Sequence, residues 1–308
     1  MLCFIVAAFA VATVLKARAN EMRAETAYPP EGQILTIDGS QMHAVVRGQG
    51  PDLVLIHGSS GSTRDFTFSL MDKLAADYRV IAIDRPGLGY SQAIDNPSIF
   101  HQAELLQKTA AELGAFQPIV MGQSYGGSVA LAWAVNHPDS LAALVPVATP
   151  SLPWTTPLSR FYKITSNPIL GPLVIPILTA WVPNAYVNSE VNAVFAPQSA
   201  PDGYAAHFGP GLTLRRSSLT ANAKQRAGLL MEIQTLSKLY DQVTVPTELL
   251  HGEADTTVGA SIHSIPLAPQ IKDANLTTLP GIGHMPHHSA EQAVIDAIHR
   301  AAARASLH

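Results

Sequence analysis

The chain has 308 residues and a formal net charge of −4, with a pI near 6.3, so it lacks the basic surface that nucleic-acid binding requires. Only 14% of its residues are charged, against about 25% in an average soluble protein, which predicts an apolar surface and hints at contact with lipid. Its single cysteine, Cys3, excludes an intramolecular disulfide and a cysteine cluster for metal.

Residues 1–28 begin with an apolar run from Leu2 to Leu15, which Lys16 and Arg18 follow. The run is shorter than the roughly 20 residues of a membrane span and fits the apolar region of a signal peptide, about 7 to 15 residues. Ala17-Arg18-Ala19 offers a cleavage pattern, but no basic residue precedes the run. We predict an uncleaved membrane anchor in residues 1–20 or a cleaved export signal, and less readily a cytoplasmic protein with an apolar arm. We expect residues 1 to about 28 to lie outside the fold.

Apolar strands alternate with helical patterns along residues 29–149. A hairpin is expected from Gln33 to Arg47, with its turn at Gly39-Ser40. The further strands are predicted at 53–57, 80–84, 119–122 and 141–147, and the helices at 66–76, 99–114 and 125–137. This alternation predicts an α/β fold with a mostly parallel, doubly wound sheet covered on both faces. The site of such a sheet lies at the carboxyl ends of its strands.

The alternation stops in residues 150–214, which are rich in aromatic residues and proline. We interpret this stretch as a helical cap whose aromatic side chains either wall a pocket for an apolar ligand or pack among themselves. Residues 167–183 carry no charge, but Pro168, Pro172 and Pro176 argue against a continuous membrane span. Contact of the cap with a membrane is the alternative. Residues 215–308 then return to the core, with a helix at 217–240, strands at 243–251 and 275–279, and a helix at 291–303.

The chemistry is expected at Gly122-Gln123-Ser124-Tyr125-Gly126, which follows an apolar strand and opens a helix. This Gly-x-Ser-x-Gly pattern is typical of a sharp turn from strand to helix that exposes a nucleophilic serine at its apex. A side chain at either glycine would clash in so tight a turn. Helix N-terminal N–H groups beneath Ser124 could receive developing negative charge.

Two later loops carry an acid and a histidine. Asp255 follows the strand that ends at His251, and His284 lies in the loop Gly281-Ile282-Gly283-His284. With Ser124 these residues come in the order serine, acid, histidine. In this order and in its motifs, the chain resembles the α/β-hydrolase fold superfamily over roughly residues 32–302. The resemblance implies a Ser124, Asp255 and His284 triad, and it does not specify a substrate.

The resemblance also implies an oxyanion hole made of two backbone N–H groups. By position in the motif these are the amides of Ser59, after the strand ending at His57-Gly58, and of Tyr125, with Ser60 as the competitor for the first role. His57 and the turn from Asp84 to Gly89 are interpreted as structural.

Other residues compete for the acid and the base. Glu253 lies two residues before Asp255, and His287 and His288 follow His284. The spacing Gly-x-x-Asp after the strand favours Asp255 as the acid, and the spacing Gly-x-Gly-His favours His284 as the base. A zinc site made of the three histidines is the rival, but the spacing of known zinc motifs is missing.

These patterns predict a serine hydrolase of the carboxylesterase type that cleaves an ester with a small to medium apolar acyl group, without cofactor or metal. The same triad could instead hydrolyse a carbon–carbon bond or act as a cofactor-free perhydrolase. A serine at position 124 argues against epoxide hydrolases and haloalkane dehalogenases, which carry an acid there. A binding protein on a hydrolase scaffold is the hypothesis from another class, and such proteins typically lose a triad member.

Overall fold

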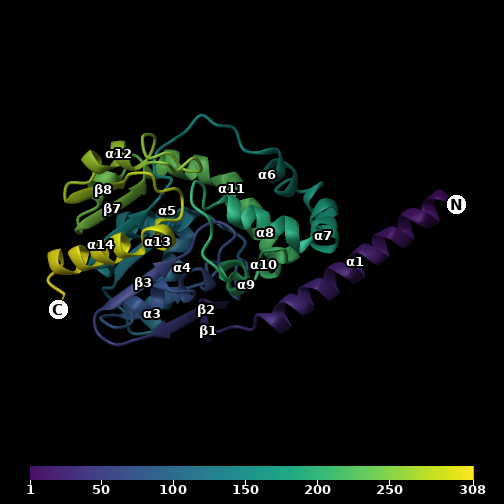
Figure 1. Cartoon of the computed structure of the whole chain (residues 1–308), viewed down its shortest axis with the longest axis horizontal. Coiled ribbons are helices and arrows are strands. Elements are labelled where there is room, and N and C mark those ends of the chain that lie inside the picture. The colour runs from purple at the N-terminus through teal and green to yellow at the C-terminus, as the bar shows by residue number, and fades with distance from the viewer. Residues whose placement is uncertain (308) are drawn as a thin grey trace.

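A computed structural model describes residues 1–307, and its centre is an eight-stranded sheet (Figure 1). The strands lie in the order β1-β2-β4-β3-β5-β6-β7-β8. Their bounds are β1 Gln33–Ile37, β2 Ser40–Arg47, β3 Asp52–Ile56, β4 Arg79–Ile83, β5 Ile119–Gln123, β6 Ala143–Val147, β7 Thr247–Gly252 and β8 Ala274–Leu279.

The first two strands form the expected antiparallel hairpin, and β2 also pairs antiparallel with β4. All later pairs are parallel, so the carboxyl ends of β3 to β8 lie at one edge of the sheet. The mostly parallel α/β sheet is therefore confirmed. β7 begins at Thr247 rather than at Val243, because Pro246 just before it has no N–H for the sheet.

Helices cover both faces of the sheet, and alternate strand residues point into two apolar cores. One core contains side chains of α4 Ile99–Glu112, α5 Tyr125–Asn136 and α11 Arg216–Leu236. The other contains side chains of α3 Leu70–Leu74 and α14 Glu291–Arg304. Short elements complete the core: α2 Arg64–Thr67, α12 Ser264–Leu267, α13 Pro286–Ser289 and the 3₁₀ turns η1 Pro138–Ser140, η2 Tyr240–Gln242 and η3 Ala268–Gln270.

The single helix predicted at 66–76 is wrong, because α2 and α3 replace it with a break at Ser69, whose φ is −154°. The sequence has no proline or glycine at this point. Tertiary contacts explain the break. Phe66 is buried in the core that contains α3 and α14, and Asp65 binds two histidines of α13.

The insertion between β6 and β7 begins with five short helices, as expected. They are α6 Arg160–Thr165, α7 Gly171–Trp181, α8 Asn184–Ala193, α9 Tyr204–Phe208 and α10 Pro210–Thr213. Pro172 lies at the start of α7, where no backbone N–H is needed, whereas Pro176 lies inside the helix. The uncharged stretch forms no single long helix, because α6 ends at Thr165 and α7 begins only at Gly171.

The amino-terminal segment forms α1, Leu2–Ala27, which is the one helix within residues 1–307 long and apolar enough to cross a membrane. Its amino-terminal end projects beyond the body (Figure 1). Its second half, which we expected to lie outside the fold, packs on the insertion: Asn20 Nδ2 donates to the Thr179 carbonyl at 2.9 Å, and Glu21 pairs with Arg216 at 2.6 Å.

Candidate active site

The turn after β5 places Ser124 at the amino end of α5 with a φ of 51°, a left-handed conformation that is unusual for a serine. The neighbouring glycines allow this turn. A Cβ at Gly122 would lie 2.3 Å from the Gly126 carbonyl oxygen, and a Cβ at Gly126 would lie 2.1 Å from that of Ile56. The sharp turn from strand to helix that the pattern predicted is therefore present.

Ser124, His284 and Asp255 are brought together in a hydrogen-bonded row. Ser124 Oγ lies 3.0 Å from His284 Nε2, and His284 Nδ1 lies 2.7 Å from Asp255 Oδ2. All three side chains are buried, and each follows the carboxyl end of a strand: β5, β8 and β7 respectively. In this arrangement the imidazole can accept the serine proton while the carboxylate holds its other nitrogen.

Three further groups hold Asp255. The Thr257 and Val258 amides each donate to its Oδ1 at 2.8 Å, and His251 Nε2 lies 3.3 Å from Oδ2. Burial alone would raise the pKa of Asp255, but the hydrogen bonds from His251 and His284 outweigh it and leave the pKa lowered. Glu253, the competing acid, is exposed and accepts a hydrogen bond from Thr278 Oγ1 instead.

The loop after β3 lies beside the serine. The Ser60 amide donates to Asn222 Oδ1 at 3.0 Å, and Asn222 Nδ2 donates to Ser60 Oγ at 2.8 Å, so α11 fixes this loop. Within residues 1–307 the amides of Ser59 and Tyr125 donate no hydrogen bond. Those two N–H groups are available to an oxyanion, whereas the Ser60 amide is engaged. Sequence analysis missed Asn222, since nothing in its local pattern ties it to residue 60.

His57 lies beneath this loop with neither ring nitrogen free. Its Nδ1 lies 2.9 Å from the Gly58 carbonyl, and its Nε2 accepts the Arg85 amide at 2.9 Å. Burial, together with the Arg85 charge, lowers the pKa of His57 to about 4. Arg85 also donates to the carbonyls of His57 and Gly58, so the turn that begins at Asp84 supports the loop. Both stretches are structural, as expected.

The loop that carries His284 is fixed from two sides. Gln123 Nε2, inside the nucleophile pattern, donates to the His284 carbonyl at 3.1 Å. From the insertion, Gln198 Oε1 accepts the Gly283 amide at 2.9 Å, and Gln198 Nε2 donates to the Gly281 carbonyl at 2.7 Å. Neither glutamine was among the expected site residues.

His287 and His288 do not join His284. Instead, their Nε2 atoms lie 3.0 and 2.9 Å from the two carboxylate oxygens of Asp65, and Tyr204 of the insertion donates to the same carboxylate at 2.7 Å. Burial would raise the pKa of Asp65, but the charges and hydrogen bonds of the two histidines keep it well below its usual value.

The donor atoms of Asp65, His287 and His288 lie within 4.8 Å of one another, a spacing that a cation could bridge. The hydrogen bonds already pair them, so the geometry needs no ion. This group differs from the rival zinc site of three histidines, because His284 binds Ser124 and Asp255.

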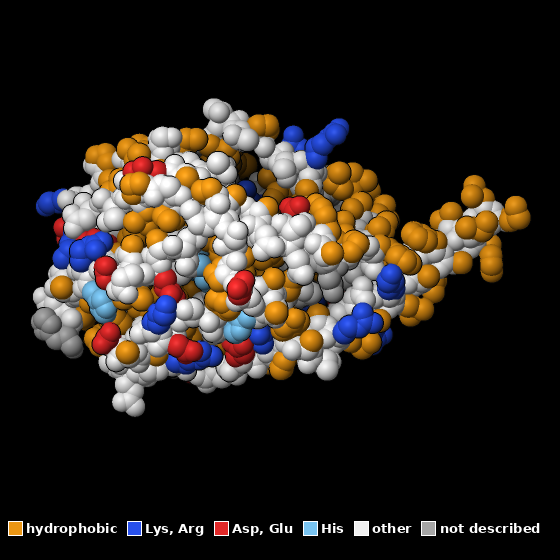
Figure 2. All heavy atoms as spheres, in the orientation of Figure 1, with side chains coloured by type: hydrophobic (Ala, Val, Ile, Leu, Met, Phe, Trp, Pro, Cys, Tyr) orange, Lys and Arg blue, Asp and Glu red, His pale blue; other side chains and the backbone are white. Residues whose placement is uncertain are grey.

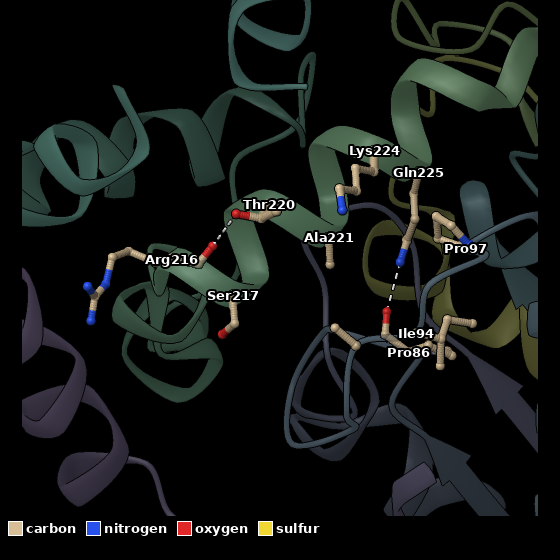
Figure 3. Close-up of a pocket in the computed structure, with 10 residues that line it drawn as sticks. Pro86, Ile94, Pro97, Arg216, Ser217, Thr220, Ala221, Lys224 and Gln225 are labelled. Atoms are coloured by element: carbon tan, nitrogen blue, oxygen red, sulfur yellow. Dashed lines mark hydrogen bonds between the residues drawn. The ribbon is translucent and has the colours of Figure 1, made fainter. Parts of the chain in front are cut away.

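The aromatic residues of the insertion divide into two sets. Phe195, Tyr204 and Phe208 are buried together against Met285, next to His288. Phe161, Trp181 and Tyr186 are exposed, so they wall no closed pocket. A cavity of about 290 Å³ lies instead between the segment from Pro86 to Pro97 and the first turns of α11 (Figure 3), and none of the three triad residues lines it.

The sequence pattern of the alpha/beta hydrolase family matches residues 53–297. Epoxide hydrolase B of Mycobacterium tuberculosis is 34% identical over 125 residues, 38% of this chain and 35% of that protein. A pimeloyl-[acyl-carrier protein] methyl ester esterase of Chromobacterium violaceum is 27% identical over 82% of this chain and 94% of its own length.

Among solved structures, a membrane phospholipase A described as a bacterial virulence factor superposes with a TM-score of 0.65 and 21% identity, covering 97% of each chain. This likeness concerns the fold. The matches to epoxide hydrolase B and several other curated relatives span about a third of those proteins' length, whereas the family pattern covers most of this chain. The chain therefore belongs to the alpha/beta hydrolase family of enzymes.

Proposed function

We propose that this protein is a serine hydrolase that cleaves carboxylic esters with an apolar acyl group. The observation that carries the proposal is the row from Ser124 Oγ through His284 to Asp255, with distances of 3.0 and 2.7 Å. The strained serine at the helix start and the two unengaged amides of Ser59 and Tyr125 support it.

The geometry suits acyl transfer. His284 takes the Ser124 proton as Oγ attacks the ester carbonyl, and the carbonyl oxygen becomes an oxyanion that the Ser59 and Tyr125 amides stabilise. The tetrahedral intermediate collapses as His284 returns the proton to the departing alcohol. Water, activated by His284 in the same way, then attacks the acyl enzyme and releases the acid. Asp255 holds the imidazole tautomer and stabilises its cationic form throughout.

The comparisons include both esterases and epoxide hydrolases. Serine at the apex of the turn favours an ester substrate over an epoxide, because a serine nucleophile forms an acyl enzyme. The low charge of the insertion supports an apolar acyl group. For location, we propose a membrane-anchored or exported protein, on the strength of α1 alone.

The test is steady-state hydrolysis of p-nitrophenyl esters from acetyl to palmitoyl by the full chain in mild detergent. Ser124→Ala should lower kcat by a factor of about a million, while Ser189→Ala, at an exposed serine, should match the wild type. Wild-type rates in Ser124→Ala would refute the proposal. A different outcome is a folded enzyme that reacts with a fluorophosphonate at Ser124 and yet turns over no ester. That result would favour carbon–carbon bond hydrolysis or perhydrolysis as the function instead.

A further inference from the structure

The exposed apolar side chains of this protein gather in two neighbouring places. Of twenty-five large hydrophobic residues that are exposed, ten lie in residues 1–22 and nine in residues 161–194. Figure 2 shows these hydrophobic side chains running from the insertion onto α1 with little charge between them. Soluble monomers rarely expose so continuous an apolar surface unless it contacts a partner or a membrane.

Within the insertion the apolar residues form a stripe on α7. Leu173, Ile177 and Trp181 recur at every fourth position and are 64%, 41% and 45% exposed, while Ile175 and Thr179 on the opposite side are buried. Ile169, 75% exposed, extends the stripe at its amino end. Helical side chains four residues apart share one face, so α7 turns a complete apolar face outward.

The stripe is continuous with α1. The Phe9 and Trp181 rings are stacked with their centroids 6.1 Å apart, and Trp181 Nε1 donates to Thr13 Oγ1 at 3.1 Å. Thr13, Ala17 and Ala24 are the buried residues of α1, and of these Thr13 lies directly against α7. α1 and α7 thus present a single surface.

The place where α7 meets α1 indicates what covers that surface. Trp181 contacts α1 at Phe9 and Thr13, which both lie in the uncharged run from Leu2 to Leu15. A bilayer that takes up this run therefore also reaches α7. Trp181 lies against Lys16 as well, at the end of the run, and tryptophan is favoured at the bilayer surface.

Basic side chains border the surface. Lys16 and Arg18 follow the apolar run of α1, and Arg160 and Lys163 lie on α6 just before the stripe. None of these four forms an ion pair with another residue in the described part of the chain, and Lys16 lies 3.7 Å from the centroid of the Trp181 ring. Unpaired cations around an apolar face complement the phosphates of anionic lipids.

We propose that the α7 stripe, with Ile169, docks into the lipid bilayer beside α1, so that the insertion itself is membrane-embedded to the depth of its exposed side chains. The occupant of this face is an anionic lipid bilayer.

The test measures the depth of a nitroxide in the full chain, on vesicles of phosphatidylcholine and phosphatidylglycerol. Cys3→Ser removes the single native thiol, and Leu173→Cys then carries the label. Phe116→Cys is the matched control, because Phe116 is 68% exposed and lies before β5, at the amino end of the sheet. Without lipid on α7 the two labels would be equally accessible.

We expect the label at 173 to be several-fold less accessible to a water-soluble nickel complex, and several-fold more accessible to oxygen, than the label at 116. Equal accessibility would overturn the proposal. Spin–spin broadening at position 173 that disappears when unlabelled protein is added would also overturn the proposal. In that case a second copy of the chain, rather than lipid, would protect the label on α7 from the nickel complex.

The introduction of negative charge checks the role of the stripe. The label is placed at Ile169→Cys, and the substitutions Leu173→Glu and Ile177→Glu are added to the same chain. We expect this label to become as accessible to the nickel complex as the label at position 116. If it stays protected from the nickel complex, the docking is contradicted. Both substituted side chains are exposed, so the fold should persist. Unchanged hydrolysis of a soluble ester by the variant separates a failure of docking from a failure of the proposed activity.

Discussion

Gln123 Nε2 donates a 3.1 Å hydrogen bond to the backbone carbonyl of His284, so the residue before the nucleophile holds the loop that carries the base. The same side chain lies close to Gly58, where an added Cβ would be 2.3 Å from its Oε1. Gln123 therefore lies against both the loop after β3 and the loop that carries His284.

Gln123→Ala should lower kcat by about 10- to 100-fold with a smaller change in KM, because a displacement of His284 by a fraction of an ångström weakens proton transfer. Steady-state kinetics on a p-nitrophenyl ester measure both constants. Gln117→Ala, at an exposed glutamine, is the control. An unchanged kcat in Gln123→Ala would show that other contacts suffice to hold His284.

The two candidate acids should differ sharply. Asp255→Asn should lower kcat by about 10,000-fold, since an amide no longer fixes the proton of His284 on Nδ1. Glu253→Gln should change kcat less than a few-fold, because Glu253 is exposed and contacts Thr278. Comparison of kcat/KM for the two purified variants decides the assignment, and the opposite order would move the acid to Glu253.

The nucleophile turn and the order of Ser124, Asp255 and His284 could be predicted because each lies in a short local pattern after a strand. The residues that hold these side chains and their loops in place could not be predicted. Asn222 is 162 residues from Ser60, and Gln123 is 161 residues from His284, so their pairing depends on tertiary structure. The same holds for Asp65, whose pairing with α13 accompanies the break that divides the predicted helix into α2 and α3.

The packing of α1 was missed for a different reason. Its apolar run dominates the pattern, and the contact face is made of small residues, Thr13, Ala17 and Ala24, at helical spacing. Such a face carries little hydrophobic signal, yet it allows close approach: a Cβ at Gly211 would lie 3.0 Å from that of Ala24.

Asp65→Asn should destabilise the protein by about 3 kcal/mol, because it leaves the enclosed side chains of His287 and His288 without their common carboxylate. The melting temperature would fall by roughly 6 to 12 °C for a domain of this size. Differential scanning calorimetry measures the change. Asp72→Asn, at a surface ion pair with Arg47, should shift the melting temperature by less than about 3 °C. Equal shifts in the two variants would contradict the role of the cluster.

Buried neutral imidazoles should make the stability of the protein depend on pH. His263 Nδ1 accepts the amides of Ser151 and Leu152 at 3.1 and 3.2 Å, which requires an unprotonated nitrogen. Burial, together with the nearby His251, lowers the pKa of His263 to about 4. His57 likewise has its pKa lowered to about 4 by burial.

Each of these groups binds a proton more readily in the unfolded chain, where a histidine pKa is about 6.5. Their stabilisation is therefore complete above about pH 6.5 and is lost as the pH falls toward 4. We expect the melting temperature to fall steadily between pH 6.5 and 4.5, and His263→Gln to reduce that slope. His101→Gln, on the surface of α4, should keep the wild-type slope, and an unchanged slope in His263→Gln would show that His263 does not contribute.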